Sequence, residues 1–240
     1  MDVTIIDGWT IHHTAVTEST NLDARDGKPG DVFTADEQTA GRGRLDHTWL
    51  SEPGKNLMLS VVLDVKGVEP QEVATLPLVV GLAAATATSL LLLRQTWIKW
   101  PNDVLIYHRK LAGILCERHG DNVIAGVGIN VNQKVFAPEI ALRATSLYQA
   151  TGTEQPIERV RRAFLNVLGP FVEDWRTSGF AALYPLIIPL DALKGRNILV
   201  LQTDRDDAPV TGLCDGIQPD GTLLVDGTAV FAGEAHVKNF

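Results

Sequence analysis

Cysteine is scarce in this chain: Cys116 and Cys214 are the two cysteines among 240 residues, and they form no CxxC pair. Two isolated cysteines argue against a disulfide framework and suit a reducing cytoplasm. Residues 1–11 include Asp2 and Asp7 and contain no apolar core, so they predict no signal peptide. We therefore expect a cytoplasmic protein.

Basic residues are in the minority. The chain has 21 Lys and Arg residues against 29 Asp and Glu residues, which gives a formal net charge of −8. A surface that binds DNA would normally show as a basic stripe. The charge balance therefore argues against a nucleic-acid partner.

Uncharged runs long enough to span a bilayer are absent except at residues 73–93. Pro77, Gly81 and several threonines dilute the hydrophobicity of this run, and no second run like it follows. A buried helix rich in Ala and Thr can pack closely against a sheet. We interpret residues 73–93 as a core helix and expect no membrane association.

Apolar content is sufficient for a full hydrophobic core, since 45% of the residues are hydrophobic and the mean hydropathy is +0.06. Several β-branched or alternating stretches, punctuated by Gly, Pro, Asp or Asn, predict strands that we expect to form one mixed sheet. They are residues 10–16, 32–35, 57–63, 97–100, 104–107, 110–116 and 123–131.

The C-terminal third predicts a helix followed by a small β structure. Pro156 precedes apolar residues at 3.6-residue spacing, and Gly179 follows them as a C-cap. We expect Pro185 and Pro189 to interrupt regular secondary structure after this helix. After Gly195, short strands separated by DG and PDG turns predict a small β-barrel.

The segment TAGRGRLDHTW, residues 39–49, has the composition of an anion clamp. Gly41 and Gly43 lack a Cβ atom, so the backbone can bring its N–H groups close to a ligand. Arg42 and Arg44 offer planar guanidinium groups for a carboxylate or a phosphate. Alone, such a Gly/Arg run is equally typical of a solvated loop or a nonspecific RNA-binding segment.

A second polar cluster, KWPND at residues 99–103, lies between two apolar strand-like runs. Pro101 marks an extended break whose flanking polar groups can face a cavity. Lys110 opens the next apolar run, which Gly113 interrupts. A lysine at the mouth of a hairpin is usually a solvated edge charge, so the significance of Lys110 depends on its neighbours.

These segments together resemble the biotin protein ligases, also called biotin:[acetyl-CoA carboxylase] ligases, in a short form without an N-terminal DNA-binding domain. The resemblance covers essentially the whole chain and consists of an ordered set of motifs. They are ESTN at 18–21, EQTAGRGR at 37–44, GKNLMLSVVL at 54–63, KWPND at 99–103, KLAGIL at 110–115 and GVGINVN at 126–132.

The resemblance implies roles for individual residues. Biotin would be bound by Ser19, Thr20, Asn21, Gln38, Gly41, Arg42, Gly43, Arg44, Lys110, Gly113 and Leu115. ATP or the adenylate would be bound by Arg42, Arg44, Trp49, Lys99, Asn102 and Asn130. Arg44, Lys110 and Asp103 would act in catalysis, with Asp103 orienting the incoming amine.

The resemblance also implies a fold and a reaction. The fold class would be α+β: a mixed β-sheet packed with helices, as a class II synthetase-like catalytic domain at residues 1–190, and a small SH3-like β-barrel at 191–240. The reaction would join biotin to a lysine of a biotin carboxyl carrier protein through biotinyl-5′-AMP. ATP and biotin would be substrates, Mg²⁺ would be carried mainly by the ATP phosphates, and the protein could form a homodimer.

One departure from the family pattern lies in the glycine/arginine loop. The family usually continues with another glycine and another arginine, whereas this chain has Leu45, Asp46, His47 and Thr48 there. A neutral imidazole at His47 would replace the third cation only in part. Three alternatives therefore remain: a lipoate or octanoate transferase of related fold, a noncatalytic biotin-binding protein, and a biotin-dependent repressor.

Overall fold

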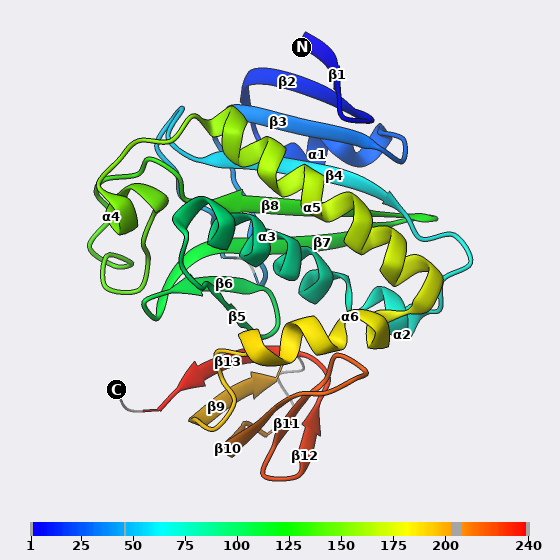
Figure 1. Cartoon of the computed structure of the whole chain (residues 1–240), viewed down its shortest axis with the longest axis vertical. Helices are drawn as coiled ribbons and strands as arrows, with labels where there is room; N and C mark the ends of the chain where they lie inside the picture. The colour runs from blue at the N-terminus through cyan, green and yellow to red at the C-terminus, as the bar shows by residue number, and fades with distance from the viewer. Residues whose placement is uncertain (1, 46, 203–207, 239–240) are drawn as a thin grey trace.

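The computed structural model describes residues 2–45, 47–202 and 208–238. Its largest element is an eight-stranded sheet in the order β1-β2-β3-β4-β8-β7-β6-β5 (Figure 1). Strands β2 and β3 are parallel, and the other neighbours are antiparallel. The mixed sheet expected from the sequence is confirmed. Its strands are β1 (Asp2–Ile6), β2 (Trp9–Thr17), β3 (Asp31–Gln38), β4 (Leu57–Asp64), β5 (Trp97–Lys99), β6 (Asp103–Ile106), β7 (Arg109–His119) and β8 (Asn122–Ile129).

Helices α3 (Leu76–Leu92) and α5 (Ile157–Ser178) lie across one face of this sheet (Figure 1). Most of α3 is buried, with Ala83, Ala84 and Ala85 fully covered, because small side chains let the helix approach the strands closely. Among the described residues, the helical stretch Pro70–Leu92 is long and apolar enough to cross a membrane, and 72% of its apolar 18-residue window is buried inside the fold. The expected core helix is confirmed.

Helix α5 carries its apolar residues on one stripe and packs them against α3 and the sheet. The indole Nε1 of Trp175 donates to Thr75 Oγ1 at 3.0 Å, just before α3 begins. Gly179 follows the helix with φ of 75°, a conformation that favours glycine, so the expected C-cap is confirmed. The short helices are α1 (Thr20–Asp23), α2 (Pro70–Val73) and α4 (Leu147–Thr151), and the 3₁₀ turns are η1 (Ala24–Asp26) and η2 (Ile188–Leu190).

The structure adds one strand to the prediction and corrects one expectation. Strand β1 was not predicted, because its exposed residues follow no clear burial pattern and it pairs with β2 alone. Pro185 does not break the chain: it lies inside α6 (Phe180–Ile187), where the apolar side chains Phe180, Leu183 and Ile187 are buried. Burial of that face holds the helix despite the missing backbone donor.

A five-stranded antiparallel sheet follows, in the order β12-β11-β10-β9-β13. Its strands are β9 (Asn197–Gln202), β10 (Val210–Ile217), β11 (Leu223–Val225), β12 (Thr228–Val230) and β13 (Gly233–Val237). Within the described residues β12 and β13 remain its two edges, so the expected closed barrel is not seen. Trp100 Nε1 donates to Gly221 O at 3.0 Å, which joins this sheet to the end of β5.

Candidate functional site

A cavity of ≈ 500 Å³ lies on the sheet face opposite α3, between the 39–49 loop, the sheet and β13. Ile114 on β7 faces Gly81 of α3, so its neighbours Gly113 and Leu115 point to the cavity side of the strand. The structure brings almost every residue singled out from the sequence to this cavity. Those lining it are Ser19, Thr20, Asn21, Gln38, Arg42, Gly43, Arg44, Trp49, Lys99, Asn102, Asp103, Lys110, Gly113, Leu115 and Asn130.

Gly41 is the exception among the described residues, because it lies behind the cavity wall. Its carbonyl accepts from Trp49 N at 2.9 Å, and Arg42 pairs with Thr48 in an isolated bridge, so the two arms of the loop lie side by side. A Cβ atom at position 41 would lie 2.5 Å from Trp49 O. Glycine is therefore needed here for the loop to close on itself rather than to touch a ligand.

One end of the cavity, formed by Ser19, Thr20, Asn21 and Gln38 and called here the polar end, contains ordered hydrogen bonds. Gln38 Oε1 accepts from Thr20 N at 2.8 Å and from Thr20 Oγ1 at 3.0 Å. Ser60 Oγ, fully buried, lies 2.7 Å from Thr20 Oγ1 and 2.6 Å from Asn21 Oδ1. These side chains are fixed in advance, as recognition of a small polar group requires.

The middle of the cavity is floored by glycine. Gly113 on β7 and Gly128 on β8 are opposite each other in register, and the indole of Trp49 lies against both. A Cβ atom at Gly128 would lie 2.4 Å from Trp49 Cε2, and one at Gly113 would lie 3.1 Å from Trp49 Cζ3. The absence of Cβ atoms at these two facing glycines therefore leaves room for the Trp49 indole to pack flat against β7 and β8.

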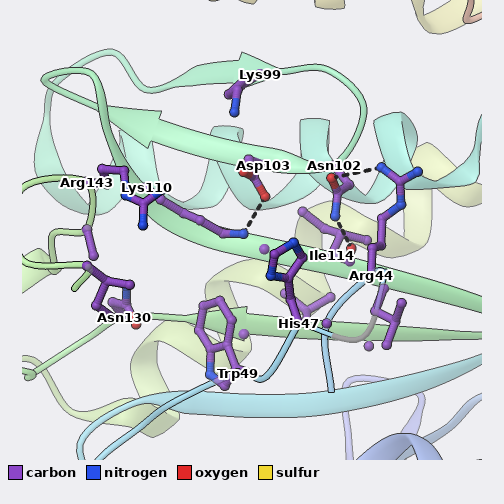
Figure 2. A pocket seen from close by; sticks show the side chains of 18 of the residues that line it. Arg44, His47, Trp49, Lys99, Asn102, Asp103, Lys110, Ile114, Asn130 and Arg143 are labelled. Atoms are coloured by element: carbon purple, nitrogen blue, oxygen red, sulfur yellow. Dashed lines mark hydrogen bonds and ion pairs between the residues drawn. The ribbon is translucent and has the colours of Figure 1, made fainter. Parts of the chain in front are cut away.

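The opposite end, formed by Lys99, Asp103, Lys110 and Arg44 and called here the charged end, gathers cations around one carboxylate (Figure 2). Lys110 Nζ lies 2.6 Å from Asp103 Oδ1 and 5.8 Å from the centre of the Trp49 ring. Lys99 is opposite Asp103 in the β5–β6 register. A bulge between Val104 and Leu105 shifts the β6–β7 pairing by which Lys110 approaches Asp103.

Arg44 extends from the loop to both sheets. Its Nη1 lies 3.4 Å from Asn102 Oδ1 and 3.2 Å from Gly233 O, and the Asn102 amide in turn donates to Ile114 O at 2.7 Å. Burial lowers the pKa of the Arg44 guanidinium, while the charges of Asp103 and Glu234 act in the opposite direction. A partly desolvated cation of this kind attracts an anion more strongly than an exposed one.

Asn130 occupies the far wall, where its Nδ2 donates to Thr145 O at 3.0 Å and its backbone N–H donates to Leu111 O at 2.9 Å. The first bond fixes the direction of the side-chain amide. Its remaining acceptor lies on the cavity wall beside Trp49 and Lys110 (Figure 2).

Sequence reasoning missed several cavity residues outside the recognised motifs. They are His108, Arg143, Arg196, Glu234 and His236 on the lining. Ser60, behind the polar end, lies inside the motif at 54–63 but was given no role. Glu234 on β13 lies 3.5 Å from His47 Nε2 and 3.7 Å from His236 Nε2, so the altered part of the loop meets the C-terminal sheet. Asp46 lies outside the described residues. The proximity of His47 and Glu234 depends on how the C-terminal sheet packs, which the sequence alone does not show.

The described side chains that line the cavity do not form a dedicated metal site. The carboxylates on the described cavity lining are Asp103, paired with Lys110, and Glu234, beside two histidines. No group of three His, Cys, Asp or Glu residues suited to a metal occurs in the described chain. Such a set fits Mg²⁺ that arrives on a nucleotide and keeps most of its ligands from phosphate and water.

Chemically, the cavity joins a rigid polar end to a cationic end across an aromatic ring. Its volume falls in the range of cofactor and small-molecule sites. The polar end suits a neutral ring with hydrogen-bonding groups, and the charged end suits a carboxylate or phosphates. The arrangement can bring two anionic groups together by neutralising both.

Comparisons with known proteins agree with this geometry. The biotin/lipoate A/B protein ligase family matches residues 10–133. The bifunctional ligase/repressor BirA of Bacillus spizizenii is 36% identical over 204 residues, covering 82% of this chain and 62% of that protein. The biotin--[acetyl-CoA-carboxylase] ligase of Mycobacterium tuberculosis is 34% identical over 236 residues, covering 91% of this chain and 84% of that protein.

Solved structures show the same architecture. The biotin protein ligase of Aquifex aeolicus in complex with biotin and ATP has a TM-score of 0.85 and 28% identity, covering 96% of this chain and 99% of that one. This chain thus spans about three fifths of the Bacillus protein and nearly all of the Aquifex one. With more than half of its length matched by the family model, the chain belongs to the biotin/lipoate A/B protein ligase family.

Proposed function

We propose that this protein is an ATP-dependent biotin ligase that attaches biotin to a lysine of a biotin carboxyl carrier protein through biotinyl-5′-AMP. The observation that carries the proposal is the convergence of the polar end, Trp49 and the charged end on one cavity. Relatives named as biotin--[acetyl-CoA-carboxylase] ligases and a structural neighbour with bound biotin and ATP support the choice of substrates.

In the first half-reaction, an oxygen of the biotin carboxylate attacks the α-phosphorus of ATP. The bond from this phosphorus to the β-phosphate bridging oxygen breaks, and pyrophosphate leaves. Arg44 and Lys110 lie where they can neutralise the two anions as they approach. Mg²⁺ bound to the phosphates supplies further charge neutralisation. Buried Thr20 and Asn21, with the half-buried Gln38, hold the ring so that its carboxylate faces the charged end.

In the second half-reaction, the lysine amine of the carrier attacks the acyl carbon of the adenylate. The bond to the AMP oxygen breaks, and the nitrogen loses a proton. An amine with a pKa near 10.4 is mostly protonated at neutral pH, so it needs a nearby acceptor. Asp103 is the carboxylate at this position, and Lys110 orients it at 2.6 Å.

The remaining contacts have supporting roles. Gly43 and Arg42 line the cavity from the 39–49 loop, and Gly113 and Leu115 line it from β7. Trp49, Lys99, Asn102 and Asn130 border the space proposed for the adenosine and its phosphates. Gly41 acts indirectly, by letting the loop close against Trp49.

A pyrophosphate-exchange assay tests the proposal. We expect biotin, with ATP and Mg²⁺, to support incorporation of labelled pyrophosphate into ATP. Lipoate and octanoate serve as competing substrates, because the matching family includes lipoate ligases. Pyrophosphate exchange that depends on lipoate and not on biotin would show that the protein is a lipoate ligase and would contradict the proposal.

Several finer features belong to the same proposal. The catalytic unit would be a class II synthetase-like domain at residues 1–190, and the five-stranded sheet would be an SH3-like domain at 191–240. The two domains meet at the charged end, where Arg44 donates to Gly233 O. This contact supports a role for the C-terminal sheet in covering the cavity. We place the protein in the cytoplasm without a membrane or nucleic-acid partner, in line with the formal net charge of −8 and the buried α3. The homodimer stays a prediction.

A further inference from the structure

Glu117, on β7, bridges two segments that lie far from it in the sequence. Its Oε1 accepts from Arg42 Nη1 at 2.9 Å, and its Oε2 accepts from Asn21 Nδ2 at 2.6 Å. Its side chain is 28% exposed, so water competes only partly for these bonds. Glu117 does not line the cavity, yet it holds one residue of the polar end and one residue of the 39–49 loop.

The shorter of two bonds from the buried Asn21 amide goes to Glu117. Asn21 Nδ2 donates to Glu117 Oε2 at 2.6 Å and to Leu115 O at 3.4 Å. Both partners can only accept, so the Asn21 nitrogen faces them and its Oδ1 faces Ser60, whose hydroxyl lies 2.6 Å away. Ser60 could donate or accept and does not make this choice by itself. Gly126 leaves the necessary room, because a Cβ atom there would lie 2.2 Å from Asn21 Oδ1.

The bond to Arg42 ties the loop to the sheet. Arg42 Nη1 reaches Glu117 on β7, and the backbone bridge of Arg42 to Thr48 joins it to the second arm of the loop. The pair is charge-assisted and partly shielded, with the Arg42 side chain 43% exposed. Loss of this pair would therefore free the loop near the polar end while leaving Arg44 bound at Gly233.

We propose that Glu117 is a positioning residue that couples occupation of the polar end to closure of the 39–49 loop. A ligand that contacts Asn21 strengthens the existing Asn21–Glu117 bond, and the Glu117 carboxylate then holds Arg42 more firmly. Because such coupling is reciprocal, a closed loop also strengthens binding at the polar end. The inference rests on the proposed function for the identity of the ligand, which is taken as biotin.

Glu117→Gln is the sharpest variant, since it keeps the shape of the side chain. Both neighbours of Glu117 are donors, so a group with two acceptor oxygens satisfies both. A glutamine amide has one acceptor and one donating nitrogen, so it can serve Asn21 or Arg42 and not the two together. The matched control is Glu154→Gln, which removes an exposed pair with Lys134 away from the cavity.

The readout is trypsin cleavage after Arg42 and Arg44, followed by mass spectrometry with and without saturating biotin. Calorimetry measures biotin binding, and thermal unfolding confirms that each variant is folded. In the wild-type protein and in Glu154→Gln, biotin should slow cleavage at the loop by at least about tenfold, the scale of one charge-assisted hydrogen bond. In Glu117→Gln, biotin should still bind at saturating concentration but should slow cleavage less than about twofold.

A second variant approaches the same pair from the loop. Arg42→Met should also lose protection, read after Arg44, and adding Glu117→Gln to it should change the cleavage rate no further. Protection by biotin that persists in folded Glu117→Gln, or losses in the two variants that simply multiply, would overturn the coupling. If the wild-type protein binds no biotin, the proposed function fails and the inference falls with it, a result distinct from failure in the variants alone.

Discussion

Lys110 Nζ lies 2.6 Å from Asp103 Oδ1 at the charged end of the cavity (Figure 2). The pair joins the start of β7 to the start of β6, so two neighbouring strands place a cation and a carboxylate at one point. A substrate carboxylate or phosphate entering here would compete with Asp103 for the ammonium group. The same pair can thus serve both proposed half-reactions, by neutralising charge in one and accepting a proton in the other.

Lys110→Ala should lower adenylate formation by at least roughly a hundredfold, the effect of removing one donor to a developing charge. Biotin-dependent pyrophosphate exchange measures it. Lys134→Ala is the control, because Lys134 pairs with Glu154 away from the cavity and should leave the rate unchanged. Near-normal exchange in Lys110→Ala would remove Lys110 from the first half-reaction.

Arg44→Gly should still form the adenylate but release it early. Arg44 connects the loop to Asn102 and to Gly233 of the C-terminal sheet, so its loss opens the cover over the charged end. Released adenylate reacts with any accessible lysine, and streptavidin blots of a mixture of carrier domain and bystander proteins detect this labelling. Labelling that stays confined to the carrier domain would show that Arg44 does not retain the intermediate.

Gly128→Ala should weaken nucleotide use by displacing Trp49. The new Cβ atom would lie 2.4 Å from Trp49 Cε2, so the indole has to leave its seat on the β7–β8 glycine pair. We expect the KM for ATP to rise severalfold, up to roughly tenfold, in keeping with the loss of about 0.5–1.5 kcal/mol of aromatic packing. Steady-state exchange kinetics over a range of ATP concentrations give this value.

Gly169→Ala is the matched control for that substitution. Gly169 lies inside α5, and its nearest neighbour would be 3.6 Å from the added methyl group, an ordinary contact. Alanine should therefore leave the KM for ATP unchanged and stabilise the helix by up to about 1 kcal/mol. Equal effects of the two substitutions on KM would show that Trp49 displacement is not the cause.

The two thiols should be inert in the folded protein. Burial raises the pKa of Cys116 and of Cys214 to about 12, with the charges of Glu117 and Asp191 acting in the same direction. A raised pKa means that almost no thiolate is present near pH 8, and the thiolate is the reactive form. Iodoacetamide at pH 8 should leave mass and activity unchanged, whereas the unfolded chain should take up two carbamidomethyl groups. Rapid alkylation of the native protein at the half-buried Cys116 or at the buried Cys214 would contradict the raised pKa values.

The strands and the two long helices could be predicted because local patterns determine them. β-branched and alternating residues mark β4, β7 and β8, and the apolar stripe of α5 ends at a glycine with positive φ. Strand β1 and the helix through Pro185 depend instead on tertiary pairing and burial, which the local sequence does not record.

The cavity residues divide in the same way. Residues in the recognised motifs, such as Arg44 and Lys110, can be identified from the sequence. Their motifs combine glycines with charged residues and follow one another in the family's order. Glu117 and Glu234 were not, since a single glutamate on a strand carries no signal until its partners are known. Their meaning comes from register and from the packing of the C-terminal sheet against the loop.

Mass spectrometry of a purified biotin carboxyl carrier domain tests the central claim most directly. The domain is incubated with this protein, ATP, Mg²⁺ and biotin. The account predicts one added biotinyl group on one lysine, no addition when ATP is omitted, and at most a trace with Lys110→Ala. An unmodified carrier with the wild-type protein, in a preparation that a known biotin ligase does modify, would contradict it.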